Sequence, residues 1–428
     1  MCITILSVGS QGDIQPYLAL AIGLKNEGYN VRFAANSNFA GLAAQYDLNF
    51  FPIQMDSYEF VQNREAQSWL ESDSILNLVL NTNRVIRPLL QRMLADVLEA
   101  CRGSEVIIYH SYALPYVHYF GKQLNIRCIP ASIHPMPTRA HPTVLSNIRR
   151  SPSKSFNLLT HLLVHQILWQ VFLPVVRKFW RGKAGISIIT PYKQILKEKQ
   201  PILCAYSPTV LPRPADLPDQ IHITGYWFLE EPPNWQPDPE LTSFLNSSQP
   251  PIYVGFGSMG NPANNQDTAN IVLKALAETG QRAVLAAGWS GLGLDRQLPS
   301  TVFLLKSISH SWLFPQMSAI VHHGGAGTTG TALRAGIPSI VIPHFGDQHF
   351  WGRRVAELGA GPEPIARKKL SAERLAQAIY TATGDRAMKE KAISIGSQIR
   401  AENGIHQAIQ IIRQYINSPY AVYATEKK

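Results

Sequence analysis

The sequence predicts an α/β fold made of two doubly wound parallel-sheet domains with a cleft between them. Two series of alternating strand and helix patterns run through the 428 residues. Alternation of this kind indicates parallel sheets covered by helices. A chain of this length suits two or three domains of ordinary size, and 45% hydrophobic residues supply ample cores.

The first series occupies residues 1–229. A first strand is expected at residues 2–8, a helix over Ile14–Asn26 and a second strand over Val31–Ala34. Further strand patterns lie at Val106–Tyr109 and Ile126–Pro130, and a basic and apolar helical insert is expected over 145–200. The spacing of apolar residues in these segments carries each assignment.

A break divides the chain at residues 230–240. The segment EEPPNWQPDP contains four prolines, which can continue neither a helix nor a central strand, so it predicts a linker. Residues 241–400 then form the second domain, and 401–428 a final helical segment. The expected elements are Ile252–Phe256, Ala269–Glu278, Ala283–Ala287, Val302–Leu305, a helical pattern from Ser371 onward, and a last helix at Ile405–Ile416.

The cysteines and the N-terminus indicate in which cellular compartment the protein is expected. The four cysteines show no CxxC spacing and predict reduced thiols in a cytoplasmic protein. The first strand begins at once after Met1, which leaves no room for a signal peptide. Because no uncharged run of about 18 apolar residues occurs, a transmembrane helix is not expected.

The stretch Ala319–Gln348 carries the most chemical information. A short buried strand leads into His322-His323, a loop with little side-chain bulk follows at 324–329, and it opens a short helix. Such a turn presents N–H groups at the positive end of a helix dipole, which predicts a phosphate site. Beyond the next strand, Asp347 and Gln348 lie where parallel sheets bind ligands, and they suit sugar hydroxyls. The pattern therefore indicates a binding site for a nucleotide-sugar.

Two simpler interpretations of these glycines compete. Gly255-x-Gly257-x-x-Gly260 and Gly325-x-Gly327-x-x-Gly330 both match a dinucleotide fingerprint. The acid expected after the first would be Glu278, inside a predicted helix, and Asp347 lies several residues beyond its strand. The other alternative is that the glycines only form tight turns.

The chain resembles the nucleotide-sugar glycosyltransferases of GT-B fold, in which two Rossmann-like domains face each other. It is most similar to the sterol glucosyltransferase and glycopeptide-antibiotic branch of the UDP-glycosyltransferase superfamily. The resemblance covers most of the chain and rests on these blocks, in order: Gly9–Asp13, Met136–Pro142, Tyr206–Pro208, Gly225–Trp227, Gly255–Ser258, and HHGGAGTT with FGDQ inside Ala319–Gln348.

The resemblance and the loop positions together suggest the catalytic groups. Asp13, at the tip of the first strand-to-helix loop, is the candidate base for the acceptor hydroxyl, and a helix cap is its alternative role. His110 stands about where plant-type relatives carry the acid that orients their histidine. It is a candidate partner of Asp13 in a swapped acid–histidine pair, and lining the acceptor pocket is the alternative. His134, Arg139 and His141, around the TRAHP segment, are expected to contact the acceptor.

The donor side follows from the loop and the resemblance. His323 and the N–H groups of Gly325, Ala326, Gly327 and Thr328 are expected to hold the two phosphates, with Ser10 and Ser258 closing from other loops. Asp347 and Gln348 are expected to bind the sugar. The plant-type tryptophan that stacks on the base is replaced here, so main-chain pairing from Ser307 or Ile308 is expected with a pyrimidine, as in UDP or its thymidine counterpart. No metal or other cofactor is expected, because the helix dipole and His323 can neutralise the diphosphate.

The positive charge is concentrated in one segment. Of the net charge of +10, residues 145–200 supply +9, from ten Lys or Arg against Glu198. An apolar stretch, Leu158–Trp180, lies in the same window and predicts an apolar helical hairpin with a basic rim. Such a rim suits peripheral contact with an anionic membrane, and a helical insert lining the acceptor cleft is the alternative. Nucleic-acid binding is disfavoured because no binding motif accompanies the charge.

The sequence therefore predicts an inverting hexosyltransferase that moves glucose, or a related hexose, from a UDP-sugar to a hydroxyl of an apolar acceptor. The expected product is a β-glycoside, since one base and no candidate nucleophile imply a single displacement. Two rivals are a nucleotide-sugar 2-epimerase of the same fold and a non-catalytic nucleotide- or lipid-binding module.

Overall fold

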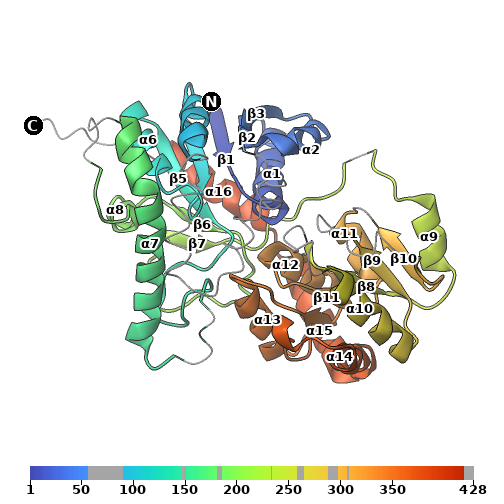
Figure 1. Ribbon diagram of the computed structural model, residues 1–428. Coiled ribbons are helices and arrows are strands. Elements are labelled where there is room, and N and C mark those ends of the chain that lie inside the picture. The colour runs from blue at the N-terminus through green and yellow to red at the C-terminus, as the bar shows by residue number, and fades with distance from the viewer. Residues whose placement is uncertain are drawn as a thin grey trace, which may run out of the picture. The chain divides into compact units, whose positions relative to one another are not determined.

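The structure is a computed structural model, and it describes residues 1–55, 90–146, 148, 151–180, 186–232, 234–257, 265–287, 297–305 and 308–418. The chain divides into two compact units. Unit 1 comprises Met1–Phe228 with Asn403–Lys428, and unit 2 comprises Leu229–Glu402. Each unit holds one parallel sheet with helices packed on it, as Figure 1 shows. The predicted α/β class with two parallel sheets is confirmed.

Unit 1 is built on a seven-stranded sheet of order β3-β2-β1-β4-β5-β6-β7. Every neighbouring pair is parallel. The chain order reverses between β1 and β4, and loops at such a switch point form the usual ligand site of an open parallel sheet. The strands are β1 Cys2–Leu6, β2 Asn30–Asn36, β3 Asn49–Ile53, β4 Val106–His110, β5 Arg127–Ser132, β6 Ile202–Cys204 and β7 Ile221–Ile223.

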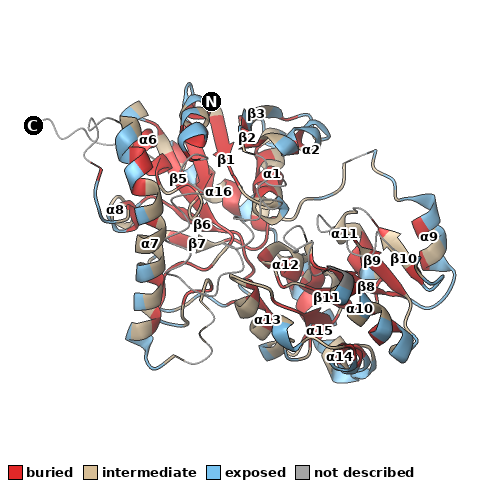
Figure 2. Ribbon diagram, in the orientation of Figure 1, coloured by how far each residue is buried: buried red, intermediate tan, exposed pale blue. Residues whose placement is uncertain are grey.

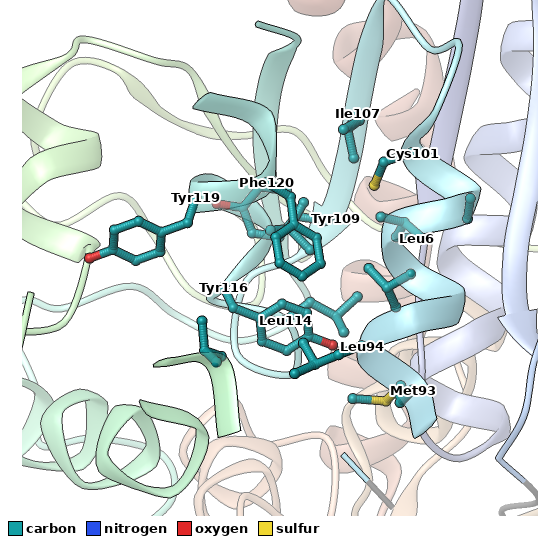
Figure 3. Close-up of a cluster of buried hydrophobic side chains, with 14 of the residues drawn as sticks. Leu6, Met93, Leu94, Cys101, Ile107, Tyr109, Leu114, Tyr116, Tyr119 and Phe120 are labelled. Carbon is teal, nitrogen blue, oxygen red and sulfur yellow. The ribbon is translucent and has the colours of Figure 1, made fainter. Parts of the chain in front are cut away.

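Helices cover both faces of this sheet, so its central strands are largely buried and rich in apolar residues. All five residues of β4 are buried, as a strand covered on both faces requires. Figure 3 shows the cluster on one face, where Leu6 and Ile107 meet the aromatic rings of Tyr116 and Phe120. The helices with bounds are α1 Gln11–Asn26, α2 Ala40–Ala44, α6 Val117–Leu124, α7 Lys154–Trp180, α8 Tyr192–Lys197 and α16 Gly404–Asn417.

The last helix, α16, returns to unit 1 and packs on α1. A Cβ at Gly23 would lie 2.5 Å from Ile405 Cγ2, so the glycine lets the two helices approach closely. Arg413 forms an ion pair with Glu27 at 2.6 Å. Residues more than 370 positions apart thus share one core.

Unit 2 holds a five-stranded parallel sheet of order β10-β9-β8-β11-β12. Its switch point lies between β8 and β11. The strands are β8 Ile252–Gly255, β9 Ala283–Ala286, β10 Val302–Leu305, β11 Ile320–His322 and β12 Ser339–Val341. The helices are α9 Pro239–Asn246, α10 Asn265–Thr279, α11 His310–Leu313, α12 Ala326–Ala335, α13 Gln348–Glu357, α14 Ala372–Gly384 and α15 Arg386–Ala401.

The insert in unit 1 differs from its prediction. Instead of a helical hairpin, a single helix of 27 residues, α7, is followed by an irregular segment at 186–191. By length and composition alone α7 could cross a membrane, contrary to the prediction, although 28% of its most apolar window is buried in the protein. The prediction missed it because His161, His165, Gln166 and Gln170 interrupt the run without lowering its hydropathy enough.

Candidate functional site

The predicted donor loop follows β11, one of the two strands at the switch point of the unit 2 sheet. β11 pairs with β8 on one side and β12 on the other, so the loop begins at the carboxyl edge between two buried strands. Gly324 has φ +89°, and a Cβ there would lie 2.6 Å from Val341 Cγ1 and 2.9 Å from Gln348 O. Only glycine fits this bend, which turns the chain from β11 into α12.

Gly325 and His323 pack directly against each other. A Cβ at Gly325 would lie 2.5 Å from His323 Nε2, and one at Gly257, on the loop after β8, would lie 2.7 Å from His323 Cε1. The imidazole is therefore held between the loops that follow two neighbouring strands. Nδ1 of His323 is buried and has no hydrogen-bond partner among the described residues. The described residues thus leave one hydrogen-bonding position of this ring unsatisfied.

Burial keeps the histidines of this region neutral. It lowers the pKa of His323 to about 4, with the nearby Asp347 carboxylate acting in the opposite direction. Burial also lowers the pKa of His310 to about 4, and the Nε2 of that ring lies 3.0 Å from the Tyr253 hydroxyl. His322 Nδ1 accepts a hydrogen bond from the Gly324 N–H at 3.1 Å, which fixes the start of the loop.

The N-terminus of α12 supplies further donors. Gly325 is its N-cap residue, and the first intrahelical bond runs from the Thr329 N–H to the Gly325 carbonyl. The N–H groups of Ala326, Gly327 and Thr328 belong to the first turn, where a helix offers no internal acceptor. The Thr329 hydroxyl is buried and lacks a protein partner in the described chain.

Asp347 and Gln348 lie at the start of α13, beyond β12. The Trp351 Nε1–H donates to Asp347 Oδ2 at 2.8 Å, which orients the carboxylate. Gln348 Oε1 accepts hydrogen bonds from the His344 and Phe345 N–H groups at 2.7 and 3.2 Å. Since that oxygen holds the loop together, any contact of Gln348 with a ligand must come from its amide nitrogen.

Three other predicted donor residues have different outcomes. Ser258 and Ser307 lie outside the described residues. Ile308 is described and packs against the hydrophobic cluster that contains Leu305 and Leu313. Its predicted role through the main chain stays a prediction.

In unit 1, Asp13 lies at the switch point, in the first turn of α1. Its Oδ2 accepts hydrogen bonds from the Ser10 N–H at 2.8 Å and from the Ser10 hydroxyl at 2.9 Å. Gly9 has φ +142°, and a Cβ there would lie 2.5 Å from Asp13 Oδ2, so glycine is required beside the carboxylate. Asp13 therefore contributes to the helix cap, and the Ser10 hydroxyl is already engaged as a hydrogen-bond donor to Asp13.

His110 is the last residue of β4, rather than the first residue after the strand as predicted. Its Nδ1 accepts from the Ala113 N–H at 3.2 Å, so the neutral ring carries its proton on Nε2. Burial, and then the neighbouring His134, lower its pKa to about 3. Nε2, and the hydroxyl of the next residue, Ser111, are buried without partners in the described chain.

Aromatic rings connect these positions, and sequence reasoning missed most of them. The Tyr17 ring contacts the His110 ring edge-on at 5.5 Å, and burial and Asp13 both raise the pKa of Tyr17. His110 and His134 have ring centroids 6.4 Å apart, and Tyr112 contacts His134 at 5.5 Å. Tyr112 stands two residues after His110 at the switch point, which is the one signal that could have found it.

Arg139 and His141 belong to a different part of unit 1. The Arg139 N–H donates to Asp216 at 2.6 Å, and Asn157 of α7 donates to the Arg139 carbonyl at 3.0 Å. The His141 carbonyl lies 3.1 Å from His161 Nε2, also on α7. These contacts attach the segment 138–143 to α7, whereas His134 lies with His110.

Metal ligation finds no support in the described parts of the chain, where no group of three or more His, Cys, Asp or Glu side chains converges. The groups able to hold an anion are those of the β11–α12 loop.

The candidate site residues lie on loops at the switch points of two parallel sheets. This arrangement is typical of proteins with two Rossmann-like units. Residues 3–112 match the glycosyltransferase family 28 N-terminal domain. Residues 270–412 match the C-terminal domain described as erythromycin biosynthesis protein CIII-like. The chain therefore carries a match to a glycosyltransferase domain in unit 1 and to a second domain family over most of unit 2.

Sterol 3-beta-glucosyltransferases are among the similar sequences. That of Debaryomyces hansenii is 34% identical, over 98% of this chain and 27% of the relative. That of Yarrowia lipolytica is 35% identical, over 100% of this chain and 30% of the relative. The chain spans less than a third of the length of these curated relatives.

Solved structures agree on the fold. A glycosyltransferase of kitacinnamycin superposes with a TM-score of 0.71 at 18% identity, covering 97% of this chain and 99% of that one. The glycosyltransferase SsfS6 of Streptomyces sp. SF2575, complexed with thymidine diphosphate, has a TM-score of 0.61 at 18% identity over 97% and 99%.

Proposed function

We propose that this chain transfers glucose from UDP-glucose to the hydroxyl of a sterol-like acceptor, with inversion at the anomeric carbon. The observation that carries the proposal is the β11–α12 loop, where Gly324 and Gly325 bring the backbone close and His323 has a ring nitrogen with no partner among the described residues. The names of the sterol 3-beta-glucosyltransferase relatives support the acceptor class and the sugar.

The diphosphate binds at the N-terminus of α12. Three first-turn N–H groups and the helix dipole favour negative charge there. His323, kept neutral by burial, can donate one hydrogen bond to a phosphate oxygen. These groups also stabilise the charge that develops on the leaving diphosphate, so transfer requires no metal.

The sugar and the nucleobase complete the donor site. Asp347, oriented by Trp351, accepts hydrogen bonds from sugar hydroxyls, and the Gln348 amide nitrogen donates one. Ile308, and Ser307 outside the described residues, pair with the pyrimidine through the main chain. Main-chain pairing contacts an edge of the base that uridine and thymidine nucleotides have in common. A TDP-sugar is therefore the competing donor.

Asp13 serves as the general base for the acceptor. Its Oδ2 is held by Ser10, which fixes the direction of the carboxylate at the switch point. The His110 Nε2–H and the Ser111 hydroxyl, which have no partner in the described part of the chain, lie at the end of β4, the strand beside β1, and suit the acceptor oxygen. The Ala113 N–H occupies the Nδ1 lone pair of His110, so this ring cannot act as a base in a pair with Asp13. His110 therefore lines the acceptor site.

The test is a matrix of donors and acceptors. Purified protein is incubated with UDP-glucose, UDP-galactose or TDP-glucose, each with a sterol, a hopanoid, a carotenoid or no acceptor, and nucleotide release is measured with and without EDTA. We expect UDP release that needs both UDP-glucose and the sterol and that persists in EDTA. An altered sugar formed without acceptor would instead establish a 2-epimerase, and tight UDP binding with no turnover in any combination would establish a binding module.

A further inference from the structure

The longest helix of the chain, α7, leaves part of its apolar surface uncovered. Four of the seven large apolar side chains that are exposed in the described residues belong to α7 and the segment after it. Leu159 and Leu163 are 58% and 52% exposed, and Ile188 and Ile189 are 61% and 59% exposed. In Figure 2, α7 is mostly pale blue and tan, unlike the red strands behind it.

Hydrogen bonds make these four residues one surface, here called the α7 patch. Leu159 and Leu163 are one helical turn apart and share a face, which Gln166 and Gln170 continue. Both glutamine Nε2 groups donate to the Ile188 carbonyl at 2.9 Å. The two leucines and the two isoleucines therefore follow one another along the same side of α7.

The opposite side of α7 is firmly attached to unit 1. Trp169 is fully buried and stacks on Tyr119 with ring centroids 5.6 Å apart. Near its N-terminal end, Asn157 donates to the Arg139 carbonyl, and the buried His161 ring bonds the His141 carbonyl. These contacts hold α7 on unit 1, which favours a position along the surface of a membrane over one across it.

Exposed basic side chains lie at both ends of α7 and along α8, the elements that flank the patch in the chain. Lys154 precedes the exposed leucines, Arg177 and Lys178 end the helix, and Lys193, Lys197 and Lys199 follow on α8 and just beyond, all of them exposed. α8 lies against α7, since the rings of Tyr192 and His165 are 5.1 Å apart. The one acid of this segment, Glu198, forms an ion pair with Lys122. The basic residues at 149, 150, 181 and 183 lie outside the described residues.

We propose that the α7 patch docks on the surface of an anionic lipid bilayer, with α7 parallel to the membrane plane. Four apolar side chains enter the boundary between headgroups and acyl chains, and the basic rim meets the anionic headgroups. A second copy of this chain is the poorer occupant, because a symmetric dimer would bring two rims of the same positive sign together. The proposal does not depend on the reaction that the protein catalyses.

Vesicle sedimentation of the full chain tests the docking. The parent should bind vesicles of phosphatidylcholine with phosphatidylserine, bind pure phosphatidylcholine at least tenfold more weakly, and come off in high salt. Replacing Leu159, Leu163, Ile188 and Ile189 together by Ser should weaken binding at least tenfold. Lys193→Gln with Lys197→Gln and Lys199→Gln should weaken it on the order of 100-fold, about fivefold for each charge.

Matched controls keep the result specific. Ile393 is 57% exposed and Tyr380 49% exposed in unit 2, so the double change of these two to Ser removes exposed apolar side chains away from the patch. Lys369→Gln with Lys391→Gln removes exposed charge from unit 2. Neither pair should alter vesicle binding, and UDP affinity should stay constant in every variant if all remain folded.

Four results would overturn the proposal. The first is a parent that stays in the supernatant with anionic vesicles. The second is equal binding by the patch variants and their controls. The third is a dimer in analytical ultracentrifugation that the four-residue Ser variant dissociates, which would assign the patch to a second copy. Bound protein that resists high salt would indicate a spanning helix instead.

Discussion

At the residue scale, Asp13 caps a helix at the position where we propose that it acts as a general base. Its carboxylate closes the N-terminus of α1 through Ser10, and it stands at the switch point where ligands bind. A cap fixes the side chain in one orientation, which a general base also requires. The capping contacts are therefore compatible with the proposed chemistry.

Asp13→Asn separates the two roles. An asparagine oxygen still accepts from the Ser10 N–H, but it cannot take the acceptor proton at neutral pH. We expect kcat to fall by about 10²–10⁴ with little change in the UDP dissociation constant. Asp238→Asn is the matched control, since Asp238 caps α9 by accepting from the Glu240 N–H at 2.8 Å. Near-parental turnover in Asp13→Asn would remove Asp13 as the base.

The donor loop depends on glycine and histidine together. Gly325→Val places a side chain against His323, and His323→Ala removes the ring, so both should weaken UDP binding about tenfold or more, equal to about 1.4 kcal/mol. Gly384→Val is the control, because a Cβ at Gly384 meets no atom within 4 Å. Calorimetry measures the affinity. Unchanged UDP affinity in both loop variants would disprove the phosphate assignment.

At the scale of elements, the periodic segments were predictable and the insert was not. Val302–Leu305 is a strand with the predicted bounds, and the final helix differs by one residue at each end, because buried apolar runs and helical spacing decide such segments. For 145–200, local pattern could not say whether the chain would turn into a second helix. In the structure the apolar stretch is one helix, α7, side-chain bonds from Gln166 and Gln170 hold the Ile188 carbonyl of the segment after it, and the short helix α8 follows.

α7 also makes the stability of unit 1 sensitive to pH. His161 is fully buried, and burial with the neighbouring His141 lowers its pKa to about 3. In the unfolded chain a histidine titrates near 6.5, so the unfolded state binds more protons between these values. The stability that the neutral ring contributes is complete above about pH 6.5 and is lost as pH falls toward about 3.

His161→Gln should reduce that dependence. Between about pH 7 and pH 5, the free energy of unfolding should fall less in this variant than in the parent, by about 1–2 kcal/mol. Urea unfolding at the two pH values measures the difference. His406→Gln, at an exposed histidine of α16, should match the parent. An equal pH dependence in His161→Gln and the parent would show that His161 is not the proton-linked group.

At the scale of the whole molecule, two switch points gather the candidate site residues. Sequence motifs located the loops after β1 and β11, because glycine, histidine and acid spacing there is local. The motifs could not reveal that Tyr17, Tyr112 and Trp227 belong to the same cluster of rings as His110 and His134. Such contacts connect distant segments of the chain, as between Tyr17 and Trp227, whose ring centroids are 5.8 Å apart. Nor could spacing show that Arg139 and His141 bond to α7 and Asp216, while His134 lies beside His110.

The configuration of the product tests the central claim most directly. The purified chain is given UDP-glucose, whose sugar is α-linked, with a sterol, and the anomeric proton coupling of the product is measured by NMR. A single displacement by the acceptor hydroxyl, with Asp13 as base and no nucleophile from the protein, predicts the large coupling of a β-glucoside. A small coupling, showing retained α configuration, or a reaction mixture with no sterol glycoside at all, would contradict the account.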